Sequence, residues 1–116
     1  MKASPIRLDT NDKNLLNSSI PNETVCSRLA LLYSMFSDQT RLKIIISLLI
    51  KEMCVNDLAE ILNTNQTTIS HQLKILRNCG VVTCNRQNKF IFYKINNSYI
   101  NDIMINGVDY ILNKAS

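Results

Sequence analysis

Residues 65–94, NQTTISHQLKILRNCGVVTCNRQNKFIFYK, decide the fold of this 116-residue chain. At about 100° per residue, the first part of this stretch places Ile69, Leu73 and Leu76 on one narrow stripe of a helix. The opposite side is polar, rich in hydrogen-bond donors and free of carboxylates, and it consists of Thr67, Ser70, His71, Lys74 and Asn78. The spacing therefore predicts an amphipathic helix whose exposed side can donate hydrogen bonds to a partner.

Both ends of this helix carry the expected signals. Asn65 can cap its N-terminus, and Gly80 stands where a left-handed residue is wanted after the C-terminus. Upstream, residues 57–63 predict a shorter amphipathic helix capped by Asn56, with a short turn at residues 63–65. Two short helices joined by such a turn predict a helix-turn-helix.

A β-hairpin is predicted directly after these helices. Residues 81–86 and 89–95 are rich in β-branched and aromatic residues, and a Gln87-Asn88 pair separates them. Arg86 and Lys89 flank the tip. A donor-rich helix followed by a basic hairpin is the layout of a winged helix-turn-helix, in which the helix reads the major groove and the hairpin contacts the adjacent backbone or minor groove.

The charge distribution favours the same function. From Ile61 to Asn101 there is no Asp or Glu, although the whole chain holds nine acids and a net charge of +4. The basic residues of this segment are Lys74, Arg77, Arg86, Lys89 and Lys94, together with the only histidine, His71. An acid-free basic segment favours contact with phosphate. The alternative is a solvated basic face that lacks acids by chance.

Length and composition indicate one small, mainly α (α+β) domain. We expect a flexible or partly helical N-terminal arm at residues 1–20, a winged helix-turn-helix domain with a two-stranded wing at 21–97, and a C-terminal dimerisation helix at 98–116. Helices near both the N- and the C-terminus are expected to form the dimer contact. No apolar run reaches the length of a membrane span and no signal peptide is recognisable, so a cytoplasmic protein with no membrane partner and reduced cysteines is expected.

The flanking helices show apolar stripes. Residues 21–36 predict a helix with a buried stripe of Val25, Leu29, Leu32 and Phe36. Residues 40–50 predict the most buried helix, with an apolar face of Leu42, Ile45, Ile46 and Leu49, and residues 53–55 a single bridging strand. The last helix, residues 98–113 with Ser98 as its cap, carries the stripe Ile100, Ile103, Met104, Val108 and Ile111. A second copy of the chain would cover this stripe, making a homodimer; packing on its own domain is the alternative.

Three stretches resemble the ArsR/SmtB family of bacterial winged-helix repressors. FSDQTRL at residues 36–42 resembles the family's ALSDPTRL, and MCVNDL at 53–58 resembles ELCVCDL. QTTISHQLKIL at 66–76, running into CGVV at 79–82, resembles QSTVSHHLKVLREAGLV. The resemblance spans roughly residues 25–105. It implies a homodimer that binds an inverted-repeat operator in double-stranded DNA and leaves it when an inducer binds.

The candidate DNA contacts lie on the recognition helix and the wing. Hydroxyl and amide side chains at the helix start suit phosphate or base edges, and the cations suit phosphate or guanine. For each residue alone, simple solvation is the alternative. The candidates are Gln66, Thr67, Thr68, Ser70, His71, Lys74, Arg77, Arg86 and Lys89.

The family's inducer sites are not intact. Asn56 replaces the second cysteine of the CVC motif, so Cys54 stands alone there. The carboxylate and histidine positions of the C-terminal helix are occupied by Asn97, Tyr99, and about Tyr110 and Asn113. A third site, at the end of the recognition helix, keeps Cys79 but has Ile75 at its other position. No metal site is therefore assigned, and Zn²⁺ is not expected to bind tightly.

The remaining soft donors are four thiols. Cys54, with Cys26 or a partner's cysteine, is the first candidate for a thiol sensor that holds a thiophilic metal or metalloid or is oxidised, and Cys79 with Cys84 is the second. As the alternative, each is a small buried hydrophobe and the regulator is constitutive. An enzyme is disfavoured because the single histidine lacks a nearby carboxylate and no phosphate-binding loop is present. A winged helix that binds only protein remains a further alternative, and a salt-dependent shift of random duplex DNA would separate the two.

Overall fold

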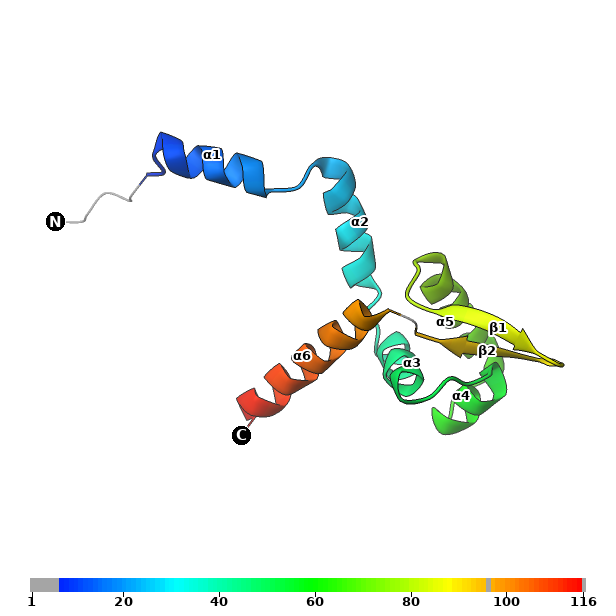
Figure 1. The fold of residues 1–116 in the computed structure, drawn as a ribbon. Helices are drawn as coiled ribbons and strands as arrows, with labels where there is room; N and C mark the ends of the chain where they lie inside the picture. Colours follow the sequence, from blue (N-terminus) through cyan, green and yellow to red (C-terminus); the bar gives the residue numbers. More distant parts are fainter. Residues whose placement is uncertain (1–6, 96, 116) are drawn as a thin grey trace. The chain divides into compact units, whose positions relative to one another are not determined.

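The computed structural model describes residues 7–95 and 97–115. Along the chain the elements are α1 (Thr10–Ser19), α2 (Glu23–Ser34), α3 (Gln39–Ile50), α4 (Val55–Ile61), α5 (Gln66–Asn78), β1 (Thr83–Gln87), β2 (Phe90–Lys94) and α6 (Ser98–Ala115) (Figure 1). They form two compact units, which divide between Ala30 and Leu31. The helix-turn-helix and the wing, from α4 to β2, lie in the second unit, whereas residues 21–30 of the predicted domain lie in the first. Residues 1–6 of the expected N-terminal arm lie outside the described residues.

The first unit exposes its apolar side chains. α1 begins with a capping box, in which the Asp9 carboxylate accepts from Asp12 N at 2.8 Å and Asp12 Oδ2 accepts from Asp9 N at 3.3 Å. Neither α1 nor α2 contains a buried residue. The predicted stripe of α2 is therefore wrong at Val25, which is 48% exposed, and at Leu29. The reason is physical: a periodic stripe shows which face can be buried, but burial needs a partner surface.

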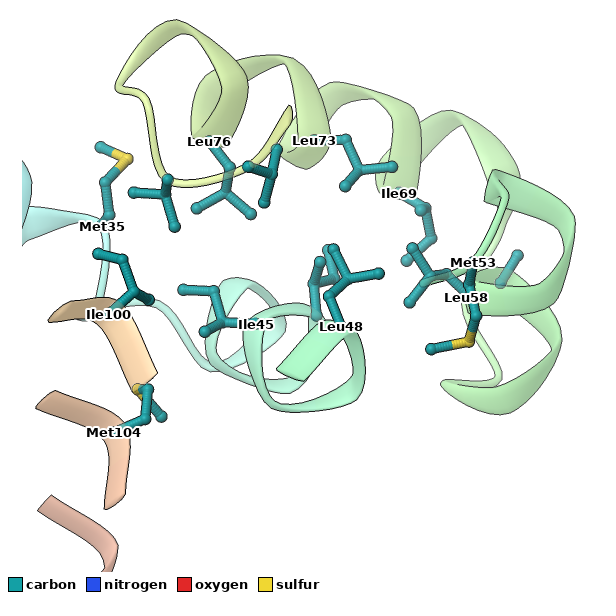
Figure 2. Packing of buried hydrophobic residues seen from close by; sticks show 14 residues of the cluster. Met35, Ile45, Leu48, Met53, Leu58, Ile69, Leu73, Leu76, Ile100 and Met104 are labelled. Carbon is teal, nitrogen blue, oxygen red and sulfur yellow. The ribbon is translucent and has the colours of Figure 1, made fainter. Parts of the chain in front are cut away.

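The core of the second unit lies between α3 and α5. Figure 2 shows Ile69, Leu73 and Leu76 projecting from α5 toward Ile45 and Leu48 of α3. The prediction for α5 is confirmed, since these three side chains are fully buried. The same cluster includes Leu58 of α4, Val81 and Val82 from the loop after α5, and Ile100 of α6.

The apolar face of α3 is rotated from the one predicted. Ile44, Ile45 and Leu48 are its buried residues, whereas Ile46 is 40% exposed. Leu42 and Leu49 are half-buried and pack against the core. Residues 44–46 are all isoleucine, so periodicity alone could not decide which of them faces inward.

The helix-turn-helix is formed by α4, a short turn and α5. α4 begins two residues earlier than predicted, at Val55, with Cys54 rather than Asn56 as its N-cap residue. In the turn, Asn63 adopts a left-handed φ of 50°, which asparagine tolerates better than most residues. The predicted cap of α5 is confirmed, because Asn65 Oδ1 accepts from Thr68 N at 2.8 Å.

The wing is the antiparallel pair β1–β2, in which Cys84 lies opposite Tyr93. Its turn is Asn88-Lys89, one residue later than predicted, with Asn88 at a φ of 59°. The predicted bridging strand is confirmed as a single bridge between Met53 and Tyr93, with N–O distances of 2.8 and 3.2 Å. This bridge fixes the base of the wing against the residue that precedes Cys54.

Gly80 connects α5 to the wing in a left-handed conformation, with a φ of +79°. A Cβ built on Gly80 would have no atom within 4 Å, so a larger residue meets no steric obstacle there. Replacing Gly80 by Ala should therefore lower the free energy of unfolding by about 1 kcal/mol, purely through backbone strain. Urea unfolding of wild type and Gly80→Ala measures this difference. An unchanged midpoint would show that the loop relaxes.

The C-terminal helix α6 divides its predicted stripe between two environments. Ile100 is 1% exposed and Met104 8%, and both belong to the core of the second unit. The prediction that Ile100 and Met104 face a second copy of the chain is therefore wrong, because their side chains are already buried within one chain. Val108 and Ile111 are 42% and 63% exposed, and Ile103 is half-buried.

The start of α6 differs from the prediction in one detail. Asn97, not Ser98, caps the helix, because Asn97 Oδ1 accepts from Tyr99 N at 2.8 Å.

No helix in the described part of the chain has both the length and the hydropathy that a membrane span needs.

Candidate nucleic-acid interface

The exposed side of α5 carries most of the predicted contact residues. Burial of Ile69, Leu73 and Leu76 fixes the rotation of this helix, so its opposite side faces outward. Thr68 is the half-buried member of the predicted set. The exposed members on the helix are Gln66, Thr67, Ser70, His71, Lys74 and Arg77.

The N-terminus of α5 offers unused backbone donors. Asn65 satisfies two helical N–H groups, those of Thr68 through its side chain and of Ile69 through its carbonyl at 3.2 Å. The first two N–H groups, of Gln66 and Thr67, lack an acceptor within the helix by geometry. Such groups, together with the positive end of the helix dipole, favour an anion such as a phosphate.

The recognition helix and the wing share one groove. Ser70 of α5 and Lys89 of the wing turn line a hollow of about 350 Å³, together with Cys54 and Asn56 from the start of α4. Phe90 and Ile91 of β2 complete its wing side, and Arg86 is exposed opposite Ile91 in the hairpin register. One predicted contact from the helix, Ser70, and one from the wing, Lys89, therefore line the same hollow.

Acidic side chains are confined to the α4 side of this surface. Asp57 accepts a hydrogen bond from the Cys54 thiol at 3.3 Å, and Glu60 lines a second hollow with Asn65 and Gln66. α5 and both strands contain no carboxylate. The electrostatic potential along α5 and the wing is consequently set by cations and by neutral donors.

The four cysteines are free thiols. Cys26 lies exposed in the first unit, whereas Cys54, Cys79 and Cys84 are half-buried in the second. Within residues 7–95 and 97–115, no three His, Cys, Asp or Glu side chains come together in a way that could hold a metal ion.

The family's C-terminal metal positions carry other interactions. The Tyr99 hydroxyl lies 3.2 Å from the Tyr33 hydroxyl, a hydrogen bond between the start of α6 and the end of α2. This bond, and the repulsion between the two phenolates, raise the pKa of Tyr33 above its usual value.

Sequence reasoning missed Arg41 and Gln72. Arg41 lies on α3, and its half-buried side chain donates from the guanidinium to Gln72 Oε1 on α5 at 3.1 Å. One signal was available: Arg41 lies in the first turn of a helix, where a cation opposes the helix dipole unless it reaches elsewhere.

Sequence comparisons agree with this architecture. Residues 38–83 match the family model described as bacterial regulatory protein, arsR family. The chain is 35% identical to the transcriptional repressor SdpR of Bacillus subtilis over 83 residues, which cover 72% of this chain and 91% of SdpR. It is 37% identical to the cadmium resistance regulator CadC of Listeria innocua over 79 residues. That match covers 67% of this chain and 66% of CadC, just under two thirds of its length.

Solved structures share the fold. The transcriptional repressor BigR of Xylella fastidiosa is 29% identical, with a TM-score of 0.67 over 77% of this chain and 90% of BigR. The antimony-specific repressor AntR superposes with a TM-score of 0.75 over 96% of this chain and 98% of its own, at 20% identity. The winged helix-turn-helix predicted from sequence is confirmed.

Proposed function

Because the chain belongs to the ArsR family of bacterial regulatory proteins, we propose that it is a homodimeric, sequence-specific DNA-binding transcriptional repressor. One observation carries the proposal: the donor side of α5 and the basic wing line a single groove, through Ser70 and Lys89. SdpR and BigR are each named as a transcriptional repressor.

In this proposal, the recognition helix and the wing make different kinds of contact with DNA. α5 enters the major groove, where Lys74 and His71 donate to base acceptors such as guanine O6 and N7. The N–H groups of Gln66 and Thr67 bind a phosphate at the helix start. Arg86 and Lys89 contact the neighbouring backbone or minor groove, which adds affinity without base discrimination.

The dimer supplies the second half-site. Exposed apolar side chains on α6, Val108 and Ile111 among them, lie beside a groove of about 400 Å³ that α3 and α6 line together with Phe36. Covering this surface with a second copy of the chain removes apolar area from water. A two-fold dimer presents two α5 helices to an inverted repeat, with half-sites about one DNA turn apart.

The alternative is a winged helix that binds only protein, and a direct binding measurement separates the two. Fluorescence anisotropy with a labelled random duplex should show binding that weakens steeply between about 50 and 200 mM salt. Selection from a random duplex pool should then enrich an inverted repeat. Absence of any salt-dependent duplex binding by the wild type would overturn the DNA-binding function.

Release from the operator has one candidate signal on this chain, which is thiol chemistry. Cys54 is the N-cap residue of α4, but its thiol makes no hydrogen bond to the backbone of that helix. Its side chain lines the same groove as Ser70 and Lys89. A metalloid or oxidised sulfur at Cys54 would therefore change the surface between recognition helix and wing. CadC is named as a cadmium resistance regulator, and a relative from Staphylococcus aureus, 32% identical, as an arsenical resistance operon repressor. Cadmium and arsenic are both elements that thiols bind well.

We expect arsenite, Cu(I), peroxide or polysulfide to release the wild type from its operator, and Cys54→Ser to abolish the release by the effective agent. Serine keeps the size and a hydroxyl donor toward Asp57 but removes the soft ligand. Cys26→Ser and Cys84→Ser test the other candidate thiols, and the effective agent should still release both variants. Full response with all four cysteines replaced, or release by nanomolar free zinc, would contradict the thiol signal; no response at all would favour a constitutive repressor.

A further inference from the structure

We propose that Arg41 is a positioning residue for DNA recognition, because it connects α5 to the end of α2 and so sets how α5 is presented to bases. The proposal rests on the DNA-binding function proposed above. It concerns a cation that lies outside the exposed face of α5 and outside the wing.

Each guanidinium nitrogen of Arg41 has its own acceptor. Nη1 donates to Gln72 Oε1 at 3.1 Å, Nε donates to the Met35 carbonyl at 3.2 Å, and Nη2 donates to the Ser34 carbonyl at 3.3 Å. The guanidinium is planar and rigid, so three bonds in different directions fix its orientation. Arg41 therefore holds two carbonyls and one side chain in a defined relative geometry.

The position of Arg41 explains why it reaches away from its own helix. It lies in the first turn of α3, whose N-terminus Asp38 caps by accepting from Arg41 N at 2.9 Å. The C-terminal end of α2 is the negative end of its helix dipole, so a cation is stabilised there, and the Ser34 carbonyl also accepts from Ser37 N and Oγ. A cation that pointed only into solvent would donate to none of these acceptors.

Gln72 is the residue of the recognition helix to which Arg41 donates. Arginine only donates, so the amide oxygen of Gln72 must face Arg41 and the amide nitrogen faces elsewhere. Gln72 follows His71 directly and lies two residues before Lys74. Burial of the apolar stripe fixes the rotation of α5, and the bond from Arg41 to Gln72 adds a constraint on its position; without that bond, the helix that carries both candidate base contacts can shift slightly.

The end of α2 is held from a second side as well. The Tyr33 and Tyr99 hydroxyls, 3.2 Å apart, connect it to the start of α6. Arg41 thus connects α5 to a segment that α6 also contacts. Base readout depends on this geometry more than phosphate contact does, because bidentate hydrogen bonds to base edges tolerate little displacement.

The test compares Arg41→Met, Gln72→Met and the double variant with Lys43→Met, which removes an equal charge from an exposed position on α3. Affinity for the selected operator and for random duplex is measured over a salt series, and the melting temperature of each variant is recorded. Each single variant should weaken operator binding about tenfold or more. For random duplex, Arg41→Met should lose no more affinity than Lys43→Met does. Gln72→Met conserves charge, so its affinity for random duplex should stay unchanged.

The double variant distinguishes the connection from two separate DNA contacts. If Arg41 acts through Gln72, the double variant should bind the operator within about twofold of Arg41→Met alone, since the second change removes nothing more. Additive losses would overturn the proposal, because Gln72 would then contact DNA independently. Arg41→Met with a salt slope lowered by about one relative to Lys43→Met would also overturn it, because Arg41 would be a phosphate contact.

Folding failure has its own control. If Arg41→Met does not fold, Gln72→Met and Arg41→Lys carry the test, and an operator-to-random ratio equal to the wild type's in both would overturn the proposal. If the wild type itself binds no duplex, the DNA-binding function fails and this proposal falls with it.

Discussion

Lys74→Ala and His71→Ala are each expected to weaken operator binding by about 1–3 kcal/mol, with the fold unchanged. Both side chains are exposed on α5, opposite the buried stripe, so neither contributes to the core. A lost contact to a base edge removes discrimination at that position, and the loss should therefore be larger for the operator than for random duplex. Anisotropy titrations with both duplexes measure the two losses.

The wing variants should behave differently. Arg86→Ala and Lys89→Ala remove cations that contact phosphate, so they should weaken binding to all duplexes alike. Each should also lower the slope of log affinity against log salt by about one. Lys43→Ala, exposed on α3 and outside the groove, is the matched control for charge. If a variant with all four residues replaced bound the operator like the wild type, the assigned surface would be wrong.

The parts of this surface that sequence predicted are those with local causes. Asn65 caps α5 through a residue three positions away, and Gly80 takes a left-handed φ that its lack of Cβ permits. The buried stripe of α5 follows from helical period, because Ile69, Leu73 and Leu76 recur at i, i+4 and i+7, and the neighbouring Ile75 is only half-buried. Such features need no knowledge of distant segments.

The parts that sequence did not predict depend on tertiary packing. Ile46 could not be distinguished from Ile44 or Ile45 by periodicity, since only the neighbouring helices decide which one is enclosed. Arg41 and Gln72 are 31 positions apart, and no local pattern joins them. The wing turn moved by one residue because Asn88, rather than Gln87, tolerates the positive φ.

The apolar half of α6 leads to the second large prediction: Val108→Asp and Ile111→Asp should convert the protein to a monomer. Both side chains are largely exposed in the single chain, so a carboxylate there is solvated until two copies meet. At a two-fold contact the same charge occurs twice, and burying it without a partner is costly. Sedimentation measures the mass, and Asn106→Asp, exposed on another face of α6, is the matched control.

Loss of the dimer should cost operator affinity far more than any single contact. One half-site binds through one α5 and one wing, whereas the dimer makes the second binding event intramolecular, which typically adds a factor of about 10² or more. Val108→Asp should therefore lose operator binding by at least that factor, while it still unfolds cooperatively and binds random duplex weakly. A variant that still sediments as a dimer would move the interface to other exposed apolar residues, such as Leu15 and Leu16 of α1.

The choice of position decides what such a variant reports. Met104 lies on the same helix but is 8% exposed and belongs to the core with Ile100. Met104→Asp should therefore lower the free energy of unfolding by several kcal/mol within each chain, because it buries an unpaired charge whatever the state of association. A monomer produced by Met104→Asp would reflect lost folding. A folded monomer produced by Val108→Asp, with Met104 in place, isolates the contact between two copies.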